Sequence, residues 1–239
     1  MIRPGEYNIT EEAIQAAGML PGSRILDIGC GEGETVKYMS ERGFRASGID
    51  ISRELIEKGS KKFPNLDIKY GDGEFLEGYP SNTMDAVIME CVLSTIPLPD
   101  ECLHEVCCVL KAGGKLILSD LYERDVNQQR LDFLKEESEK QSHIPFNRET
   151  CGEKHERHVS FRYKGKFVLE HLIPYLENEL GFKIIYQADK SNELLEYAGE
   201  LILNGISPEQ CYCKANELSH AGYFLIIAEK QEAFSYYGS

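Results

Sequence analysis

The sequence predicts an α/β fold built on a mostly parallel β-sheet with helices on both of its faces. Between residues 24 and 120, short apolar runs alternate with segments of helical periodicity. Strands separated by helices form βαβ units, and these give parallel sheets with right-handed crossovers. The apolar runs are nearly continuous, as expected for strands that are covered on both faces.

Capping and turn residues set the boundaries in the first half of the chain. Asn8 is a candidate N-cap and Pro21 a stop for the first helix, while Gly43 ends the second. Ser52 is a candidate N-cap for the third helix, and Gly113 follows the fourth. The predicted strands here are 24–28, 44–51, 66–70, 84–91 and 115–120, and the predicted helices are 8–20, 35–42, 52–63 and 100–110.

The second half of the chain is less regular. Its predicted strands are 182–187 and 223–230, and its predicted helices are 125–141, 167–180, 191–203 and 208–218. Pro174 is expected to kink the helix that contains it, because proline removes a helical hydrogen bond. The polar stretch 143–166 is expected to be irregular. No linker rich in proline, glycine or serine marks a domain boundary.

Composition narrows the class of protein. The 239 residues carry a net charge of −14, which disfavours nucleic acid as a partner because the surface repels phosphates. No apolar stretch is long enough to span a membrane, and the first residues lack the apolar segment of a signal peptide. Eight cysteines in a chain of this kind are expected to be reduced thiols. We therefore expect a cytoplasmic protein without a membrane partner.

A glycine-rich loop follows the first predicted strand, with Gly29, Gly31 and Gly33 at alternate positions. A dinucleotide-binding loop would have its third glycine where this chain has Glu34, and the lysine of a P-loop is absent. Glu32 and Glu34 would also repel a pyrophosphate. Since glycines let the backbone approach a ligand closely, the loop favours a nucleoside that carries no phosphates.

Four carboxylates occur at the carboxyl ends of predicted strands, where open parallel sheets bind their ligands: Asp27, Asp50, Asp72 and Glu90. Asp50 lies 21 residues after Gly29, at the place where an acid accepts the hydroxyl hydrogens of a ribose. Asp72 is placed to accept from an exocyclic amine. S-adenosylmethionine, with its adenosine, sulfonium and α-amino group, fits a site of this charge.

Five sequence motifs follow one another between residues 26 and 120. They are LDIGCGEG (26–33), GIDIS (48–52), GDGEF (71–75), MDAVIMECVLS (84–94) and VLKAGGKLILSD (109–120). Together they resemble the class I S-adenosylmethionine-dependent methyltransferases of the small-molecule type. The resemblance implies a Rossmann-like, doubly wound sheet of seven strands with the last one antiparallel. It also implies a single domain over 1–239, in which 121–180 and 188–221 are helical lid insertions at the acceptor site.

The resemblance assigns roles in cofactor binding. It implies that the loop glycines lie under the methionine part, that Asp50 binds the ribose, that Ile51 lies against adenine, and that Asp72 and Gly73 lie at its amine. The residues expected to bind the cofactor are Asp27, Gly29, Cys30, Gly31, Gly33, Asp50, Ile51, Asp72, Gly73, Glu74 and Glu90. No metal is expected among them.

The predicted reaction is an in-line methyl transfer to a small-molecule acceptor at oxygen, nitrogen or carbon. A general base is needed only where the acceptor holds a proton. His143, His155 and His158 are candidates because histidine titrates near neutrality. Cys91 is a further candidate, although its position at a strand end is equally typical of an inert thiol in the core.

Two other functions stay open. Cys151, Cys211 and Cys213 lie in the expected lid, where thiols would suit a soft acceptor such as a metalloid or another thiol. A zinc site formed with the neighbouring histidines is a weaker alternative, because the spacing matches no recognised pattern. A module that binds the cofactor without catalysis is the third possibility.

Overall fold

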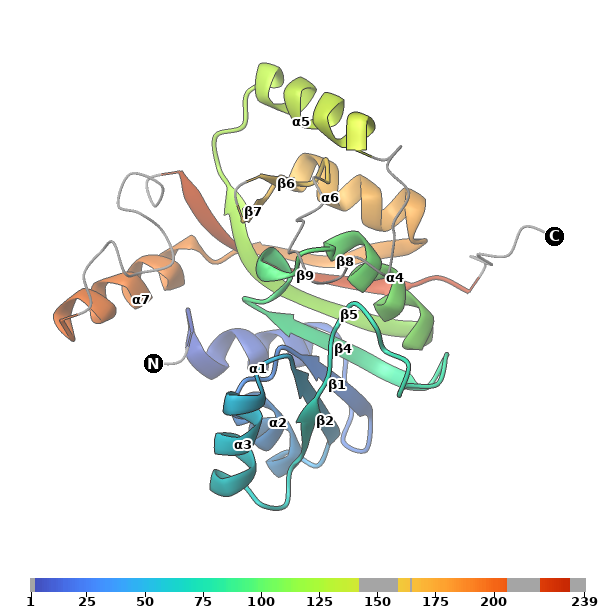
Figure 1. The fold of residues 1–239 in the computed structure, drawn as a ribbon, viewed down its shortest axis with the longest axis vertical. Coiled ribbons are helices and arrows are strands. Elements are labelled where there is room, and N and C mark those ends of the chain that lie inside the picture. Colours follow the sequence, from blue (N-terminus) through green and yellow to red (C-terminus); the bar gives the residue numbers. More distant parts are fainter. Residues whose placement is uncertain (1–2, 142–158, 164, 206–219, 233–239) are drawn as a thin grey trace.

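The computed structural model describes residues 3–141, 159–163, 165–205 and 220–232. They form one mixed sheet with helices on both faces (Figure 1). The parallel part has the strand order β3–β2–β1–β4–β5. These strands are β1 Arg24–Ile28, β2 Arg45–Asp50, β3 Asp67–Tyr70, β4 Met84–Glu90 and β5 Leu110–Glu123. The order reverses between β1 and β4, and this reversal creates the crevice in which ligands of such sheets lie.

The antiparallel part completes the sheet. β9 (Ala221–Lys230) lies between β5 and β8 (Phe182–Asp189) and runs antiparallel to both, so that β8 is parallel to β5. The predicted mostly parallel sheet with an antiparallel last strand is therefore confirmed. β5 is longer than the predicted 115–120, because its pairing with β9 continues from Lys115 to Glu123.

Two very short strands were not predicted. β6 (Arg162–Tyr163) and β7 (Lys166–Phe167) pair with each other, and β7 also pairs with the end of β5. The prediction that 143–166 is wholly irregular is wrong at this point, because two-residue strands are too short to show an alternating pattern. Residues 142–158 lie outside the described residues, as does the helix predicted at 208–218.

The helices agree with the sequence closely. They are α1 Glu6–Ala16, α2 Glu34–Glu41, α3 Arg53–Lys62, α4 Pro99–Val109, α5 Gln128–Gln141, α6 Leu169–Pro174 and α7 Ser191–Leu203. Ser52 caps α3 as predicted, since its hydroxyl accepts from the Leu55 N–H. Asn8 is not a cap: α1 begins after Gly5, whose φ of 65° suits glycine. At Pro174 the α-helix gives way to a π-helical turn, Tyr175–Glu179.

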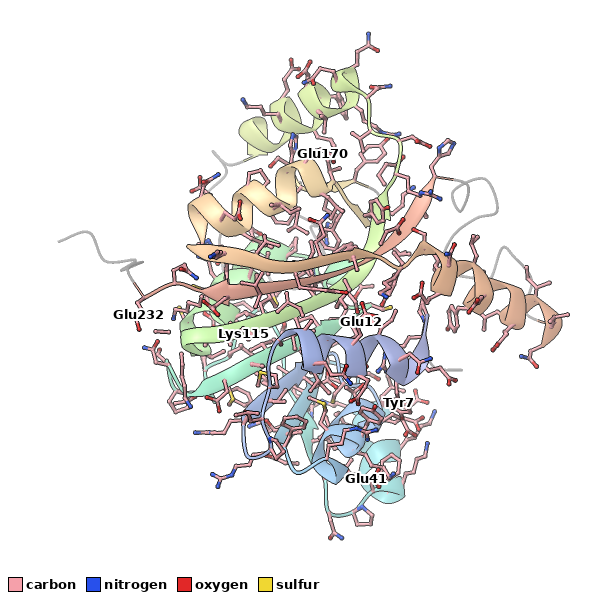
Figure 2. All side chains as sticks on the ribbon, turned by 180° about the vertical axis from the view of Figure 1, so that it is seen from behind. Tyr7, Glu12, Glu41, Lys115, Glu170 and Glu232 are labelled. Atoms are coloured by element: carbon pink, nitrogen blue, oxygen red, sulfur yellow. The ribbon has the colours of Figure 1, made fainter. Side chains whose placement is uncertain are left out.

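Two apolar layers cover the sheet, one on each face. Leu103 and Val106 of α4 and Leu172 of α6 pack on one face. On the other, Ile9 of α1 packs together with side chains of α2 and α7. The Glu12 carboxylate, labelled in Figure 2, accepts hydrogen bonds from Tyr186 of β8 and from Lys190, which precedes α7. α1 is thereby fixed to β8 and to the start of α7.

No helix among the described residues combines the length and the apolar character needed to cross a membrane.

Candidate functional site

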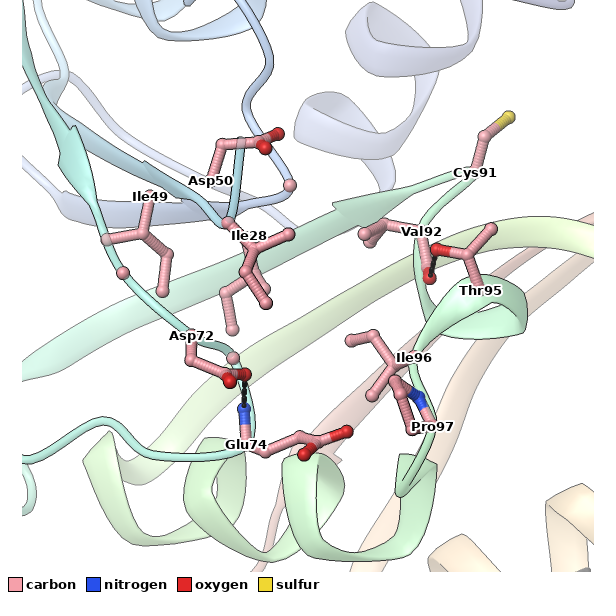
Figure 3. Close-up of a pocket in the computed structure, with 14 residues that line it drawn as sticks. Ile28, Ile49, Asp50, Asp72, Glu74, Cys91, Val92, Thr95, Ile96 and Pro97 are labelled. Atoms are coloured by element: carbon pink, nitrogen blue, oxygen red, sulfur yellow. Dashed lines mark hydrogen bonds between the residues drawn. The ribbon is translucent and has the colours of Figure 1, made fainter. Parts of the chain in front are cut away.

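A cavity of about 290 Å³ opens at the carboxyl ends of β1, β2 and β4 (Figure 3). Its walls come from three places: the ends of β1 and β2, the segment after β3, and the loop after β4. The lining residues are Ile28, Gly29, Ile49, Asp50, Ile51, Gly71, Asp72, Gly73, Glu74, Cys91, Val92, Thr95, Ile96 and Pro97. The position is the one that the strand order predicts for a ligand.

The glycine loop follows β1, and its first glycine, Gly29, lines the cavity. Gly29, Gly31 and Gly33 have φ of 77°, 56° and 87°, a region that side chains other than glycine rarely adopt. A Cβ added at Gly29 would overlap the side chain of Val92, whereas one at Gly31 would meet no atom within 4 Å. The loop therefore needs glycine for its backbone path, and at Gly29 for space as well.

Three consecutive N–H groups of this loop are already bonded. The N–H groups of Gly29 and Cys30 both donate to the Ile49 carbonyl, at 2.8 and 2.9 Å, and the N–H of Gly31 donates to Asp50 Oδ2 at 2.8 Å. Phosphate-binding loops instead turn such N–H groups toward the anion. The loop thus offers close approach to a ligand but few free donors for a phosphate.

Asp50 organises the segment after β2. One carboxylate oxygen accepts from Gly31, and the other accepts from the Ser52 N–H at 2.7 Å. Ile51, which lies between Asp50 and Ser52 in the chain, is 64% exposed at the rim of the cavity. An apolar side chain left open at a cavity rim is suited to cover a flat apolar ligand surface.

Two further carboxyl groups lie at the opposite end of the cavity, where Figure 3 shows Asp72 and Glu74 together. Asp72 Oδ1 accepts from the Glu74 N–H at 2.9 Å, and Glu74 Oε1 accepts from the Leu98 N–H at 2.8 Å. Burial raises the pKa of Glu74 above its ordinary value. Glu74 thereby joins the segment after β3 to the loop after β4.

A second group of charges surrounds the start of α1. Glu90 pairs with Arg3 at 2.9 Å and accepts from the hydroxyls of Thr10, at 2.7 Å, and Thr35, at 3.2 Å. Asp27 is 5% exposed and receives no hydrogen bond from any described residue. Burial and the neighbouring Glu90 raise its pKa, while Arg3 opposes that shift. The positive charge of Arg3 thus acts on both Glu90 and Asp27.

Cys91 follows β4 with φ of 56°, an unusual value for a side chain that is not glycine. Its Sγ lies 2.9 Å from Tyr223 Oη, and that hydroxyl donates to Ser119 Oγ at 3.1 Å. Although Cys91 is exposed at the cavity, the partial removal of its sulfur from water, followed by the charge of Asp120, raises the pKa of Cys91 to about 12. The sulfur is therefore a neutral thiol at neutral pH rather than a nucleophilic thiolate.

The other described cysteines share this property. Burial raises the pKa of each of them: Cys30, Cys102, Cys107 and Cys108. Within the part of the chain that the structure describes, no cluster of three histidine, cysteine or acidic side chains could hold a metal ion. His143, Cys151, His155, His158, Cys211 and Cys213 lie outside the described residues.

The structure brings most of the predicted cofactor residues to one cavity. Those that line it are Gly29, Asp50, Ile51, Asp72, Gly73 and Glu74, together with the candidate Cys91. The remainder, Asp27, Cys30, Gly31, Gly33 and Glu90, lie outside the lining. Sequence reasoning missed the wall formed by Thr95, Ile96 and Pro97. The turn-forming Pro97 and Pro99 were the signal that a loop follows β4.

Comparison with known proteins agrees with this geometry. Residues 26–118 match the family described as methyltransferase domain. A demethylmenaquinone methyltransferase of Renibacterium salmoninarum is 30% identical over 107 residues, which are 45% of this chain and 45% of that protein. An arsenite methyltransferase of Rattus norvegicus is 32% identical over 145 residues, 51% of this chain and 39% of that protein. The chain thus matches less than half the length of either relative.

Among solved structures, a phosphoethanolamine N-methyltransferase of Haemonchus contortus in complex with S-adenosyl-L-methionine has the same fold. Its TM-score is 0.64 at 17% identity, and the match covers 97% of this chain and 54% of that one. The likeness in fold thus covers a larger share of the chain than either sequence match does.

Proposed function

We propose that this chain, whose residues 26–118 match the methyltransferase domain family, binds S-adenosylmethionine in the cavity and transfers its methyl group to a small molecule. One observation carries the proposal. Asp50 ends β2, Asp72 follows the neighbouring strand β3, and both line the same cavity as Gly29, which begins a loop with three N–H groups already bonded. That combination suits an adenosine without phosphates.

The proposed contacts follow the two ends of the adenosine. Asp50 accepts from the ribose hydroxyls, because each of its oxygens keeps a lone pair after bonding one backbone N–H. Ile51 covers the adenine, and Asp72 accepts from its amine. We propose that Asp27 and Glu90, which share Arg3 and lie just outside the cavity lining, flank the methionine side of the site.

The cofactor supplies a methyl group that is already activated for displacement. The work left to the protein is to align the acceptor with the methyl group and to exclude water. We propose that 121–180 and 188–221 build the acceptor side of the site. His143, His155 and His158, in the first of these segments, stay the proposed general bases for an acceptor that must lose a proton.

A soft acceptor is the second candidate, and the likeness to an arsenite methyltransferase favours it. The described cysteines argue against a thiolate role for themselves, since burial raises their pKa. The candidates for such a role are therefore Cys151, Cys211 and Cys213. Replacing these three with serine separates the two candidates, because only a soft acceptor requires thiols.

Calorimetry tests the proposed cofactor. We expect S-adenosylhomocysteine and S-adenosylmethionine to bind and NAD to bind far more weakly. Tighter binding of NAD would overturn the proposal. Methyl transfer is then tested by incubating the protein with labelled cofactor and a panel of quinol, amine and metalloid acceptors. Cofactor binding with no turnover on the panel would favour a non-catalytic module.

A further inference from the structure

Arg162 lies in β6, well beyond the matched domain of residues 26–118, yet its guanidinium reaches the loop after β4. Its Nη1 donates to the Ile96 carbonyl and, at 3.4 Å, to that of Ser94, while its Nη2 donates to the Pro97 carbonyl at 3.1 Å. The residue is only 8% exposed. A buried arginine on three backbone carbonyls holds the path of that backbone.

The same loop is held from its other sides by two acids. Asp120 Oδ2 accepts from the Ser94 N–H at 2.9 Å, and Glu74 Oε1 accepts from the Leu98 N–H at 2.8 Å. Its own backbone bonds are few, such as the one from Thr95 N to the Val92 carbonyl at 2.9 Å. The shape of the loop therefore depends on side chains from other elements, and Arg162 makes the largest number of these bonds.

The loop is a wall of the cavity. Thr95, Ile96 and Pro97 line it, and Figure 3 shows Ile96 and Pro97 facing Asp72 and Glu74 across the open space. Under the proposed function this is the adenine end. A shift of the backbone at these residues would change the width of the slot into which a flat ring fits.

We infer that Arg162 is a positioning residue for cofactor binding: by holding the carbonyls of residues 94–97, it sets the adenine-side wall of the cavity. The inference rests on the proposed function. It also gives the β6–β7 pair a role in the cofactor site, in addition to its place in the segment proposed to build the acceptor side. Lysine could not replace arginine fully, because an ammonium group cannot bridge several carbonyls in the fixed geometry of the guanidinium fork.

Two variants and two ligands test the inference. Arg162→Gln removes the charge and the fork, and Arg162→Lys keeps the charge alone. Binding of S-adenosylhomocysteine and of methylthioadenosine, which has the adenosine but lacks the amino-acid part, is measured by calorimetry. Arg124→Gln is the matched control, because Arg124 belongs to the same segment but is exposed. Thermal unfolding without ligand shows which variants are folded.

We expect Arg162→Gln to lower the affinity for both ligands by the same factor, about 10- to 100-fold, which is the range for lost hydrogen bonds from a charged group. The affinity of Arg162→Lys should lie between that of this variant and that of the wild type, and Arg124→Gln should bind as the wild type does. A folded variant that had lost stability alone would keep the wild-type affinity for both ligands.

Wild-type affinity for both ligands in folded Arg162→Gln would overturn the inference, as would a loss confined to S-adenosylhomocysteine. If Arg162→Gln does not fold, wild-type affinity of Arg162→Lys for both ligands would overturn it in the same way. Failure of the wild-type protein to bind either ligand is a different result, because it would overturn the proposed function itself.

Discussion

The carboxylate of Asp50 and the backbone N–H of Gly31 are joined by a hydrogen bond of 2.8 Å. This bond ties the end of β2 to the glycine loop after β1, so that the acid proposed to bind the ligand also shapes the loop on which the ligand rests. Substitutions at the two residues should consequently affect binding in related but distinguishable ways.

Replacing Asp50 with alanine should weaken the binding of S-adenosylhomocysteine by about 1.5–3 kcal/mol, the range for hydrogen bonds that involve a charged group. Asp67→Asn is the control, because Asp67 is exposed on the neighbouring strand β3 and does not line the cavity. Calorimetry on both variants measures the difference. Unchanged affinity in a folded Asp50→Ala protein would remove Asp50 from the ribose.

Replacing Gly31 with valine should abolish cofactor binding. The new side chain would enter space that is open in the structure, and its left-handed backbone costs about 1–2 kcal/mol of stability. Gly113→Val is matched for strain, because Gly113 also has a positive φ, of 74°, and open space around it, but lies away from the cavity. Equal loss of binding in both variants would mean that strain alone is responsible.

Replacing Arg3 with methionine should destabilise the fold by about 3–5 kcal/mol, because a buried acid then loses its partner. Arg3 and Glu90 are both largely buried, with 9% and 6% of their side chains exposed. Arg24→Met removes an exposed arginine and should change the free energy of unfolding little. Urea denaturation compares the two variants. Equal and small effects would show that the Arg3 pair does not stabilise the protein.

Asp120→Asn should change how stability depends on pH. Burial raises the pKa of Asp120 from 3.8 to about 6 in the folded protein. The folded state then favours the protonated acid, so its contribution to stability is full below pH 4 and is lost as the pH rises through 6. The size of this loss is about 3 kcal/mol.

The measurement for Asp120 is the free energy of unfolding at pH 4 and at pH 7. Relative to the wild type, Asp120→Asn should gain about 2 kcal/mol between pH 4 and pH 7, because asparagine does not titrate and the unfolded acid is already partly ionised at pH 4. Asp132→Asn, on the exposed face of α5, should show no such gain. A parallel pH dependence in Asp120→Asn and the wild type would contradict the raised pKa.

The sequence predicted the parts of this molecule that depend on local pattern. Ser52 caps α3 as expected, since its signal lies within one turn of the chain. Asp50 and Asp72 reach one cavity because parallel strands end at the same edge, which the alternation of strands and helices already implies. The apolar run at 223–230 predicted β9 as the last strand, and the family resemblance implied that this strand is antiparallel, as it is.

The parts that were missed depend on contacts between distant segments. Arg162 shows no signal in its own neighbourhood, because its partners lie more than sixty residues earlier in the chain. Arg3 is similar, since its pairing with Glu90 arises only when α1 packs on the sheet. Asn8 looked like a cap, but Gly5, three residues earlier, begins the helix instead. Side-chain type alone does not decide between two possible starts.

The bonded amides of the glycine loop also bear on which metabolites can compete for the site. Adenosine occurs in many cellular molecules, and most of them carry phosphates. A loop whose N–H groups at Gly29, Cys30 and Gly31 are directed at β2 offers a phosphate few donors to replace the water it must leave. Selectivity of this kind needs no steric clash and no repelling side chain. The chain would thus favour adenosine-containing molecules that lack phosphates, because the loop offers phosphates few hydrogen-bond donors.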